Sequence, residues 1–470
     1  MFLYSAILLA LQATTTLAVQ PLIIQGADFV NAKTGNRYQI LGVAYQPGGE
    51  GGYKPQTGED PLSDGSVCLR DAALMQKLGV NAIRVYNVSP DINHDLCASI
   101  FNAVGIYMVL DVNAPLSGES IDRGDPRPSY TASYLNRTFA VVEAFKNYPN
   151  TLLFFAGNEV INDVPTGRNI PPYMRAVTRD LKNYIKKHST RSIPVGYSAA
   201  DVRDTLLDTW NYLQCTTTGD TSDMSRVDLF ALNSYSWCGD STYTTSSYDK
   251  LIADFSNTSV PVFFSEYGCN KPSPRIFTEV PVLYGPLMTP VMSGGLVYEY
   301  SQEPSDYGLV NINSNNSAQL NSDFDSLQAQ YNKLNITALQ GVKAENATVT
   351  PPTCRSSLIT KSTFNNNFTI PSVPTGAQAL IDNGVSTSNT GNLVPIGNTK
   401  VTHVVQQTNG QVLDLSITVI PDDESNIPSG QTPGTATTSS APAATTTKKS
   451  GATNIKMTSC ACGPVLACVG

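Results

Sequence analysis

The sequence predicts an α/β fold, namely a (β/α)8 TIM barrel followed by a small β-rich C-terminal domain. Three observations predict it. Short apolar runs recur between residues 22 and 300, longer segments of helical periodicity separate them, and after residue 302 β-branched stretches interrupted by Asn, Gly and Pro take over. Nearly continuous hydrophobic strands are typical of a parallel sheet that is buried on both faces. An open, doubly wound sheet is the structural alternative.

The apolar runs are expected to be the eight barrel strands in chain order. They are Tyr38–Tyr45, Val80–Tyr86, Gly105–Asp111, Leu152–Asn158, Ile193–Ser198, Val227–Asn233, Pro261–Glu266 and Gly294–Tyr300. The helices expected between them include Cys68–Leu78, Tyr134–Lys146 and Met174–Lys187. Residues 22–37 contain a turn signal at Thr34-Gly35-Asn36, which predicts a hairpin that closes the bottom of the barrel.

Changes in composition divide the chain into parts. Residues 1–18 form an apolar stretch that ends in small residues, which predicts a signal peptide; a buried N-terminal helix is the alternative. Residues 19–310 are assigned to the barrel. Residues 311–420 are assigned to the β-rich domain, with a connecting helix over 323–334 and β-like stretches such as Ala377–Ile381 and Val412–Val419.

The last fifty residues have a different character. Residues 421–452 are rich in Ser, Thr, Pro, Gly and Ala and cannot bury a core, which predicts an O-glycosylated linker. Residues 453–470 are mildly apolar and follow the small residues Ser450, Gly451 and Ala452. This pattern predicts the propeptide of a GPI lipid anchor, with an ordinary disordered terminus as the alternative.

Charge and histidine content narrow the function classes. Only 14% of the residues are charged and the net charge is −8, which argues against binding to nucleic acid or to anionic membrane surfaces. A neutral polymer is a more natural partner. The three histidines do not form a metal-ligand pattern, and no phosphate-binding glycine motif occurs, so neither a metal nor another cofactor is expected.

A secretory route changes the interpretation of the cysteines and asparagines. The first six of the nine cysteines are expected to form structural disulfides in an oxidising compartment, although spacing alone leaves their pairing open. Asn-x-Ser/Thr triplets predict N-glycosylation. The triplet at Asn87 follows a predicted core strand and is expected to be too buried for modification. The candidates are Asn136, Asn257, Asn315, Asn335, Asn346 and Asn367.

Two apolar strands end on a glutamate. Glu159 follows Phe154-Phe155-Ala156-Gly157-Asn158, and Glu266 follows Phe263-Phe264-Ser265. By strand count these are the fourth and seventh barrel strands. Barrel enzymes place catalytic residues at the C-terminal ends of their strands, and an unpaired carboxylate is otherwise costly in a core. The alternative is that each glutamate is a salt-bridged strand end.

Two carboxylates that converge on one bowl suit a retaining glycosidase mechanism. We expect Glu159 to act as the acid/base and Glu266 as the ionised nucleophile. Arg84 is expected to hold Glu266 and to lower its pKa. Asn158 is placed to contact the 2-hydroxyl of the sugar. Other strand-end and stacking residues are expected to bind substrate, namely Tyr45, Gln46, Tyr86, Asp111, Tyr235, Tyr298 and Tyr307.

These residues also carry a family likeness. The chain resembles the fungal β-1,3-glucanosyltransferases of glycoside hydrolase family 72, which are lipid-anchored enzymes that remodel the cell wall. The likeness covers roughly residues 20–420 and rests on Gly42-Val-Ala-Tyr-Gln-Pro-Gly, Leu78-Gly-Val-Asn-Ala-Ile-Arg-Val-Tyr, Phe155-Ala-Gly-Asn-Glu-Val-Ile-Asn, Phe263-Phe-Ser-Glu-Tyr-Gly-Cys and Val297-Tyr-Glu-Tyr.

The resemblance implies how the site residues and cysteines are used. It implies Glu159 as acid/base and Glu266 as nucleophile, with Gln46, Tyr86, Asp111, Asn158, Tyr235 and Tyr298 in the sugar site. It implies disulfides Cys68–Cys97, Cys215–Cys354 and Cys238–Cys269, the second of which would tie the barrel to the β-rich domain. The cysteine-rich carbohydrate-binding module of some members is absent, because only Cys460, Cys462 and Cys468 follow Cys354.

The resemblance also implies an activity and a location. The enzyme would cut β-1,3-glucan internally and transfer the new reducing end to the non-reducing end of another β-1,3-glucan, without a cofactor. It would act as a monomer at the cell surface, reaching the membrane only through its lipid anchor. From the residues alone, a retaining endo-β-1,3-glucanase and a non-catalytic glucan-binding wall protein remain as alternatives, because transfer and hydrolysis share one intermediate.

Overall fold

The computed structural model describes residues 19–344 and 349–430. The predicted signal peptide, most of the Ser/Thr/Pro-rich linker, the predicted anchor propeptide and the triplet at Asn346 lie outside these residues.

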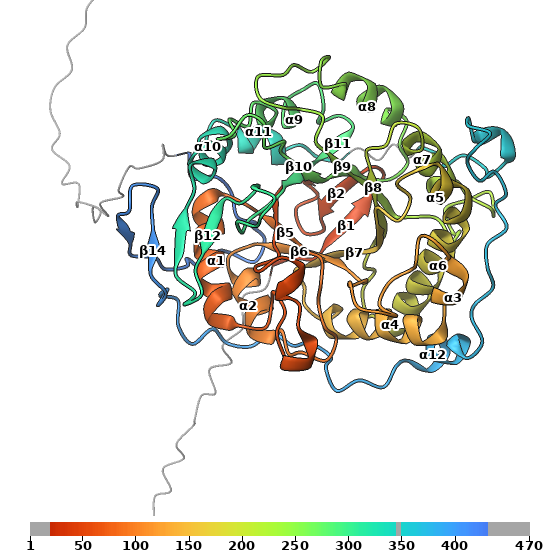
Figure 1. The fold of residues 1–470 in the computed structure, drawn as a ribbon, viewed down its shortest axis with the longest axis horizontal. Coiled ribbons are helices and arrows are strands. Elements are labelled where there is room, and N and C mark those ends of the chain that lie inside the picture. The colour runs from red at the N-terminus through yellow and green to blue at the C-terminus, as the bar shows by residue number, and fades with distance from the viewer. Residues whose placement is uncertain (1–18, 345–348, 431–470) are drawn as a thin grey trace, which may run out of the picture. The chain divides into compact units, whose positions relative to one another are not determined.

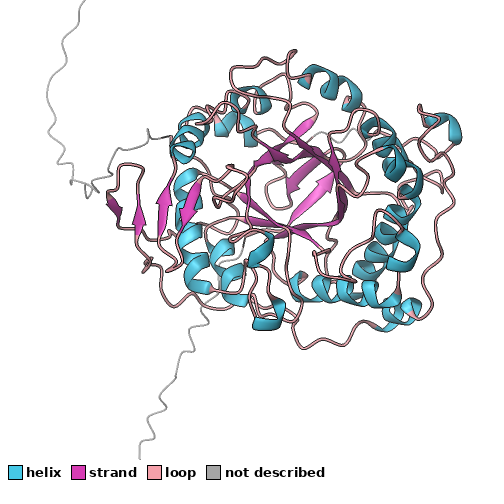
Figure 2. Cartoon of the chain, in the orientation of Figure 1, coloured by secondary structure: helices cyan, strands magenta, loops and turns pink. Residues whose placement is uncertain are grey.

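Within residues 19–344, eight parallel strands close into a barrel in the order β10-β11-β4-β5-β6-β7-β8-β9 (Figures 1 and 2). Each strand pairs in parallel with both neighbours, as the predicted (β/α)8 barrel requires. The fold prediction is therefore confirmed. The barrel strands are β4 (Ile40–Ala44), β5 (Ala82–Val85), β6 (Tyr107–Asp111), β7 (Thr151–Asn158), β8 (Val195–Ala200), β9 (Leu229–Ser234), β10 (Val262–Tyr267) and β11 (Met292–Val297).

Helices surround the barrel and bury their apolar faces against it (Figure 2). The longer ones match the predicted helices, and α1 shows why its ends lie where they do. The side chain of Asp64 accepts hydrogen bonds from the first turn, and Gly79 ends the helix at a φ of +91°. The helices are α1 (Gly65–Leu78), α2 (Asp95–Ala103), α3 (Pro126–Ser129), α4 (Ala132–Phe145), α5 (Val164–Asn169), α6 (Pro171–His188), α7 (Leu206–Gln214), α8 (Tyr248–Phe255) and α9 (Val280–Leu283).

A small antiparallel sheet closes the end of the barrel where the strands begin, as predicted. It consists of β1 (Leu22–Gln25), β2 (Asp28–Asn31) and β3 (Arg37–Tyr38). Phe29 packs edge-to-face on Phe263 inside the barrel, with ring centroids 5.9 Å apart. The Tyr38 hydroxyl donates to the carbonyl oxygen of Asn81, immediately before β5. This sheet does not cover the opposite end of the barrel, where the C-terminal ends of the strands lie.

The β-rich C-terminal region is present as a four-stranded sheet, but it is smaller than expected. The sheet joins β12 (Val310–Ile312) and β13 (Ala318–Leu320) to β14 (Val405–Gln406) and β15 (Val412–Leu413). The predicted connecting helix is α10 (Ser322–Tyr331), followed by α11 (Ile336–Gln340).

Residues 349–430, here called the C-terminal strap, run along the outside of the helix ring (blue in Figure 1). Two predictions fail in it. Ala377–Ile381 is helical, within α12 (Ala377–Asn383), and only the first two residues of Val412–Val419 form a strand. The reason is that much of the strap packs on the barrel instead of pairing with itself. Its backbone bonds to the barrel at several points, such as Asn426 N to the carbonyl oxygen of Gly105 at 3.0 Å.

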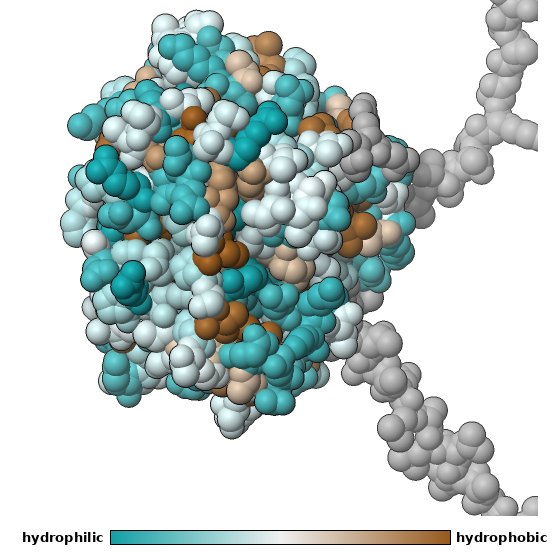
Figure 3. Space-filling model, turned by 90° about the vertical axis from the view of Figure 1, so that its right-hand side faces the viewer, coloured by the Kyte–Doolittle hydropathy of each residue, from teal (hydrophilic) through white to brown (hydrophobic). Residues whose placement is uncertain are grey.

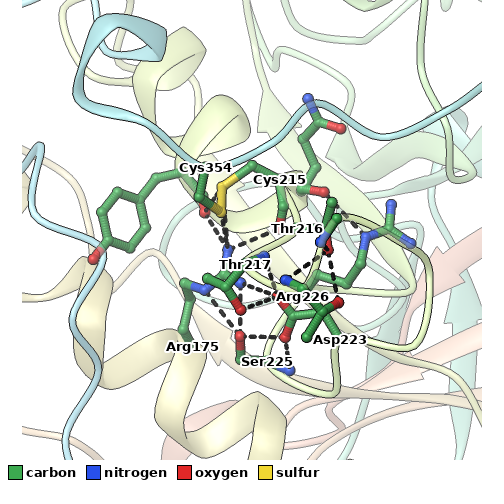
Figure 4. Close-up of a disulfide and its surroundings, with 12 residues drawn as sticks. Arg175, Cys215, Thr216, Thr217, Asp223, Ser225, Arg226 and Cys354 are labelled. Carbon is green, nitrogen blue, oxygen red and sulfur yellow. Dashed lines mark hydrogen bonds and ion pairs between the residues drawn. A yellow bond between two sulfur atoms is a disulfide. The ribbon is translucent and has the colours of Figure 1, made fainter.

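All three implied disulfides are present, between Cys68 and Cys97, Cys215 and Cys354, and Cys238 and Cys269. The second joins the end of α7 to the strap (Figure 4). The buried guanidinium of Arg175 lies beside it, with Nη1 3.4 Å from the sulfur of Cys215 and 3.5 Å from that of Cys354.

On the face that Figure 3 presents, the surface of the described residues is mostly hydrophilic. Figure 3 shows apolar residues in small groups among polar ones on the face that it presents. No described helix has the length and apolar character needed to cross a membrane.

Candidate active site

The C-terminal ends of the barrel strands surround one cavity of about 980 Å³. Because all eight strands are parallel, the residues that end them gather on one face. Most predicted substrate residues lie in its wall together with both predicted catalytic glutamates. These are Gln46, Tyr86, Asp111, Asn158, Glu159, Glu266 and Tyr298.

Glu266 lies on β10 and is nearly buried, with 8% of its surface exposed. Three donors hold its carboxylate. The Tyr235 hydroxyl donates to Oε2 at 2.6 Å, and the Tyr86 hydroxyl to Oε1 at 2.9 Å. Arg84 Nη1 donates to Oε1 at 3.2 Å, which makes an ion pair. The carboxylate therefore has a fixed orientation, with both oxygens engaged.

Arg84 lowers the pKa of Glu266, as predicted, but the net pKa of Glu266 is raised. Burial raises the pKa of Glu266 above its usual value, and the nearby carboxylate of Glu159 adds to the rise. Arg84, Tyr235 and Tyr86 act in the opposite direction, as predicted for Arg84, but they do not outweigh the loss of solvent. Sequence reasoning identified the partner and underestimated the burial.

Arg84 is fully buried on β5 and serves two carboxylates. Nη2 donates to Asp111 Oδ2 at 3.0 Å, while the guanidinium faces the rings of Tyr86 and Phe155 at 4.3 and 4.9 Å. Burial raises the pKa of Asp111, against the opposing charge of Arg84. Asp111 Oδ1 is buried and has no hydrogen-bond partner among the described residues, although Asp111 is one of the residues that line the cavity.

Glu159 follows the last residue of β7 in a left-handed conformation, with a φ of +50°. Such a conformation is uncommon outside glycine, and it ends the strand with a sharp turn. The Glu159 backbone N–H donates to the carbonyl oxygen of Ser198 at 2.8 Å, which holds the turn in place. The Asn233 amide donates to Glu159 Oε1 at 2.8 Å.

Polar side chains from neighbouring strands form a buried network that sequence reasoning mostly missed. Ser198 on β8 donates to Asn158 Oδ1 at 2.8 Å, and Ser265 on β10 donates to Asn233 Oδ1 at 2.8 Å. Asn233 Nδ2 also reaches Asn158 Oδ1 at 3.2 Å. The Asn158 oxygen therefore accepts from two donors, Ser198 and Asn233. The sequence signal that could have revealed this network is a serine inside a mostly apolar strand, as at Ser198 and Ser265.

Asn233 connects the two glutamates. Its Nδ2 donates to Glu159, and its Oδ1 accepts from Arg84 Nη1 at 3.3 Å. The same Arg84 nitrogen donates to Glu266 Oε1. A single amide and a single guanidinium therefore lie between the two carboxylates.

Three tyrosines form a cluster beside Glu266. The ring of Tyr235 lies edge-on to Tyr298 at 6.2 Å and to Tyr307 at 5.5 Å, and Tyr298 to Tyr307 at 5.3 Å. Only Tyr298 lies among the residues that line the cavity. Tyr235 acts on the site through its hydrogen bond to Glu266.

Tyr45 does not lie where it was predicted. Its side chain is completely buried and packs against Phe101 and Tyr300, and its hydroxyl donates to Asp71 Oδ2 at 2.8 Å. Side chains alternate between the two faces of a strand, so Gln46 faces the cavity and Tyr45 the surrounding core. We therefore remove Tyr45 from the substrate-binding residues.

The segment between β6 and α4 forms a large part of the cavity wall, and sequence reasoning missed it. Residues 113–118 and 120–123 line it together with Asp125, Pro128 and Ser129. Tyr134 donates to Asn113 Oδ1 at 2.7 Å, and Arg137 pairs with Glu119 at 3.4 Å, which attaches the segment to α4. The composition of this segment is that of an ordinary loop, so the sequence did not predict that it would lie over the C-terminal ends of the strands.

The glycosylation triplets differ in position. Asn87 is half-buried and lies in the cavity wall, so a glycan attached there would occupy the substrate space. The other described candidates are exposed, namely Asn136, Asn257, Asn315, Asn335 and Asn367.

We predict that active enzyme secreted from a glycosylating host is unmodified at Asn87. Peptide mass spectrometry before and after glycan removal would check this, with the exposed triplets as internal controls. An active fraction that carries a glycan at Asn87 would contradict the placement of the cavity.

Known proteins are similar to this chain. Residues 11–335 match glycoside hydrolase family 72, described as glucanosyltransferase. The chain is 54% identical over 423 residues to 1,3-beta-glucanosyltransferase gel2 of Aspergillus fumigatus, covering 90% of this chain and 88% of the relative. It is 42% identical over 385 residues to 1,3-beta-glucanosyltransferase GAS5 of Saccharomyces cerevisiae, covering 82% and 76%.

A solved structure is also similar. Saccharomyces cerevisiae Gas2p, as a mutant in complex with laminaritetraose and laminaripentaose, aligns with a TM-score of 0.66 and 35% identity. The alignment covers 77% of this chain and 76% of that one. The chain belongs to the glucanosyltransferases of glycoside hydrolase family 72.

Proposed function

We propose that this protein is a retaining β-1,3-glucanosyltransferase in which Glu266 is the nucleophile and Glu159 the acid/base. The observation that carries the proposal is the short connection from Glu159 through Asn233 and Arg84 to Glu266. Retaining enzymes place their two carboxyl groups about 5–5.5 Å apart, so the proposal requires Glu159 and Glu266 to face one sugar ring across this connection. The names of the relatives supply the substrate and the transfer reaction.

The hydrogen bonds support the division of roles. A nucleophile must be ionised, and three donors, one of them cationic, stabilise the carboxylate of Glu266. Glu159 has a neutral amide as its side-chain partner, which suits a group that exchanges a proton during each cycle.

In the first step, a Glu266 oxygen bonds to the anomeric carbon while the bond to the glycosidic oxygen breaks. Glu159 gives its proton to that oxygen, and the reducing-end fragment leaves with a free 3-hydroxyl. In the second step, Glu159 takes the proton from the 3-hydroxyl of an incoming glucan. The acceptor oxygen then displaces Glu266, so the new linkage keeps the β configuration.

Transfer requires that a sugar reaches the intermediate before water does. The cavity wall supports an acceptor site through the ring of Tyr298, because aromatic rings bind sugar faces, and Tyr235 and Tyr307 pack against that ring. The hydrogen bond between Arg84 and Asp111 is proposed to hold the side chains at the base of the cavity in place.

We predict that a laminari-oligosaccharide incubated with the enzyme gives products longer than the input. Size-resolved chromatography of the reaction checks this, with Glu266→Gln enzyme as the blank. Products that are only shorter than the input would favour a retaining endo-β-1,3-glucanase.

We further propose that the enzyme acts as a monomer outside the cell, at the plasma membrane or in the wall, held there by a GPI anchor. The three disulfides support an oxidising compartment. β-1,3-Glucan is the proposed donor and acceptor, and no cofactor takes part in the cycle.

A further inference from the structure

Glu299 is a third carboxyl group in the cavity wall. It follows β11 and stands next to Tyr298, and only 4% of its surface is exposed. Its backbone is held on both sides, because its N–H donates to the carbonyl oxygen of Tyr307 at 3.1 Å and its own carbonyl accepts from Leu309 N at 3.1 Å. The side chain therefore has a defined place on the wall that also contains Gln46 and Glu266.

The surroundings of Glu299 differ from those of Glu266. Ser305 Oγ donates to Glu299 Oε1 at 3.2 Å, and the Tyr298 side chain also forms a hydrogen bond with Glu299. No ion pair among residues 19–344 and 349–430 includes Glu299. The titratable groups that face it are Glu266 on β10 and Tyr298, Glu303 and Tyr307 on its own segment.

Arg275 bonds to the backbone beside Glu299, but its charge is paired with another carboxylate. Arg275 donates to the backbone carbonyls of Tyr298 and Tyr307 and pairs with Asp323 at 2.6 Å. Burial therefore raises the pKa of Glu299 to about 7, and the negative charges of Glu303 and Glu266 add to the rise.

The protonation state decides what this side chain offers to a sugar. A neutral carboxyl group has one O–H donor and an acceptor oxygen, whereas a carboxylate has acceptors alone. An ionised Glu299 would also place a second negative charge beside the nucleophile. The neutral form suits a cavity that binds an uncharged, hydroxyl-rich polymer.

We propose that Glu299 is a substrate-binding residue that acts in its neutral form, donating its O–H to a hydroxyl group of the bound glucan. This proposal rests on the proposed glucan substrate. Because a neutral carboxyl is present below its pKa, the hydrogen bond exists in acidic solution and is lost as the pH rises through about 7.

The test is the pH dependence of KM and kcat for laminari-oligosaccharide consumption between pH 5 and 9. We expect the wild-type KM to rise about three- to tenfold across the transition, as the loss of one hydrogen bond implies, with a smaller change in kcat. Glu299→Gln keeps a donor at every pH, so its KM should stay flat over the same range. An unchanged transition in this variant, or a flat wild-type profile, would overturn the proposal.

If Glu299→Gln does not fold, variants of two neighbouring residues test the same proposal. Glu303→Gln removes a like charge outside the cavity wall, so the KM transition should move to lower pH. Ser305→Ala removes one of the two donors that stabilise the carboxylate, so the transition should move to higher pH. A structural role would not produce opposite shifts, and shifts in one direction would refute the assignment.

The measurement is independent of whether the products are longer or shorter than the donor, because it follows donor consumption. A failure of the transferase proposal would appear in product length, and a failure of this one in the KM profile.

Discussion

Replacing Glu266 by Gln is expected to lower turnover by about 10⁴-fold or more, because an amide cannot form the glycosyl ester. The fold should survive the change. Gln has nearly the same shape, its oxygen can accept from Arg84 and Tyr86, and its NH2 group can donate to the Tyr235 hydroxyl, which rotates to accept. Binding of a laminari-oligosaccharide should therefore remain measurable.

Initial rates on a laminari-oligosaccharide and calorimetric binding of laminaripentaose check the two halves of this prediction. Glu424→Gln is the matched control, since Glu424 is exposed on the strap, away from the cavity wall. Turnover of the Glu266 variant at the level of this control would refute the nucleophile assignment. Loss of both binding and thermal unfolding cooperativity would show instead that the pocket had collapsed.

Replacing Cys215 and Cys354 together by Ser is expected to destabilise the protein by about 5 kcal/mol, because the disulfide closes a separation of 139 residues. It is the covalent tie between the barrel and the strap. Around it, Cys354 N donates to the carbonyl oxygen of Thr216 at 2.9 Å, and Arg175 pairs with Asp223 at 2.9 Å (Figure 4). These contacts remain in the variant, so the strap should loosen without the barrel rearranging.

Denaturant unfolding measures this loss, and the double Ser variant of Cys238 and Cys269 is the comparison. That disulfide closes a separation of only 31 residues, which gives about 4 kcal/mol by the same relation. A smaller loss for Cys215 and Cys354 than for Cys238 and Cys269 would contradict the view that the strap is stabilised by its covalent tie.

The C-terminal strap shows where sequence patterns fail. Its β-branched stretches suggested strands, yet residues 377–383 form a helix and much of the rest lies extended against the barrel. A strand is defined by a partner, and for most of the strap the partners are barrel loops and helices far away in the chain, such as Gly105 for Asn426. Local composition carries no information about such distant partners.

The barrel was predictable because its signal is local. Each strand is buried on both faces and therefore reads as an apolar run, and each catalytic candidate stands where such a run ends. Glu159 and Glu266 on the fourth and seventh strands follow from this pattern and from barrel topology alone. The segment at 113–123 and the buried serines could not be found in this way, because only closure of the barrel brings them to the site.

The sequence by itself determined the barrel, the two carboxylates and the likeness to a wall-remodelling family. The tertiary structure decided what surrounds each carboxylate. It showed that Tyr45 belongs to the core, that burial outweighs Arg84 in setting the pKa of Glu266, and that Asn233 connects the pair. The physical reason is that burial and hydrogen bonding depend on atoms contributed by separate strands, and these meet only when the barrel closes.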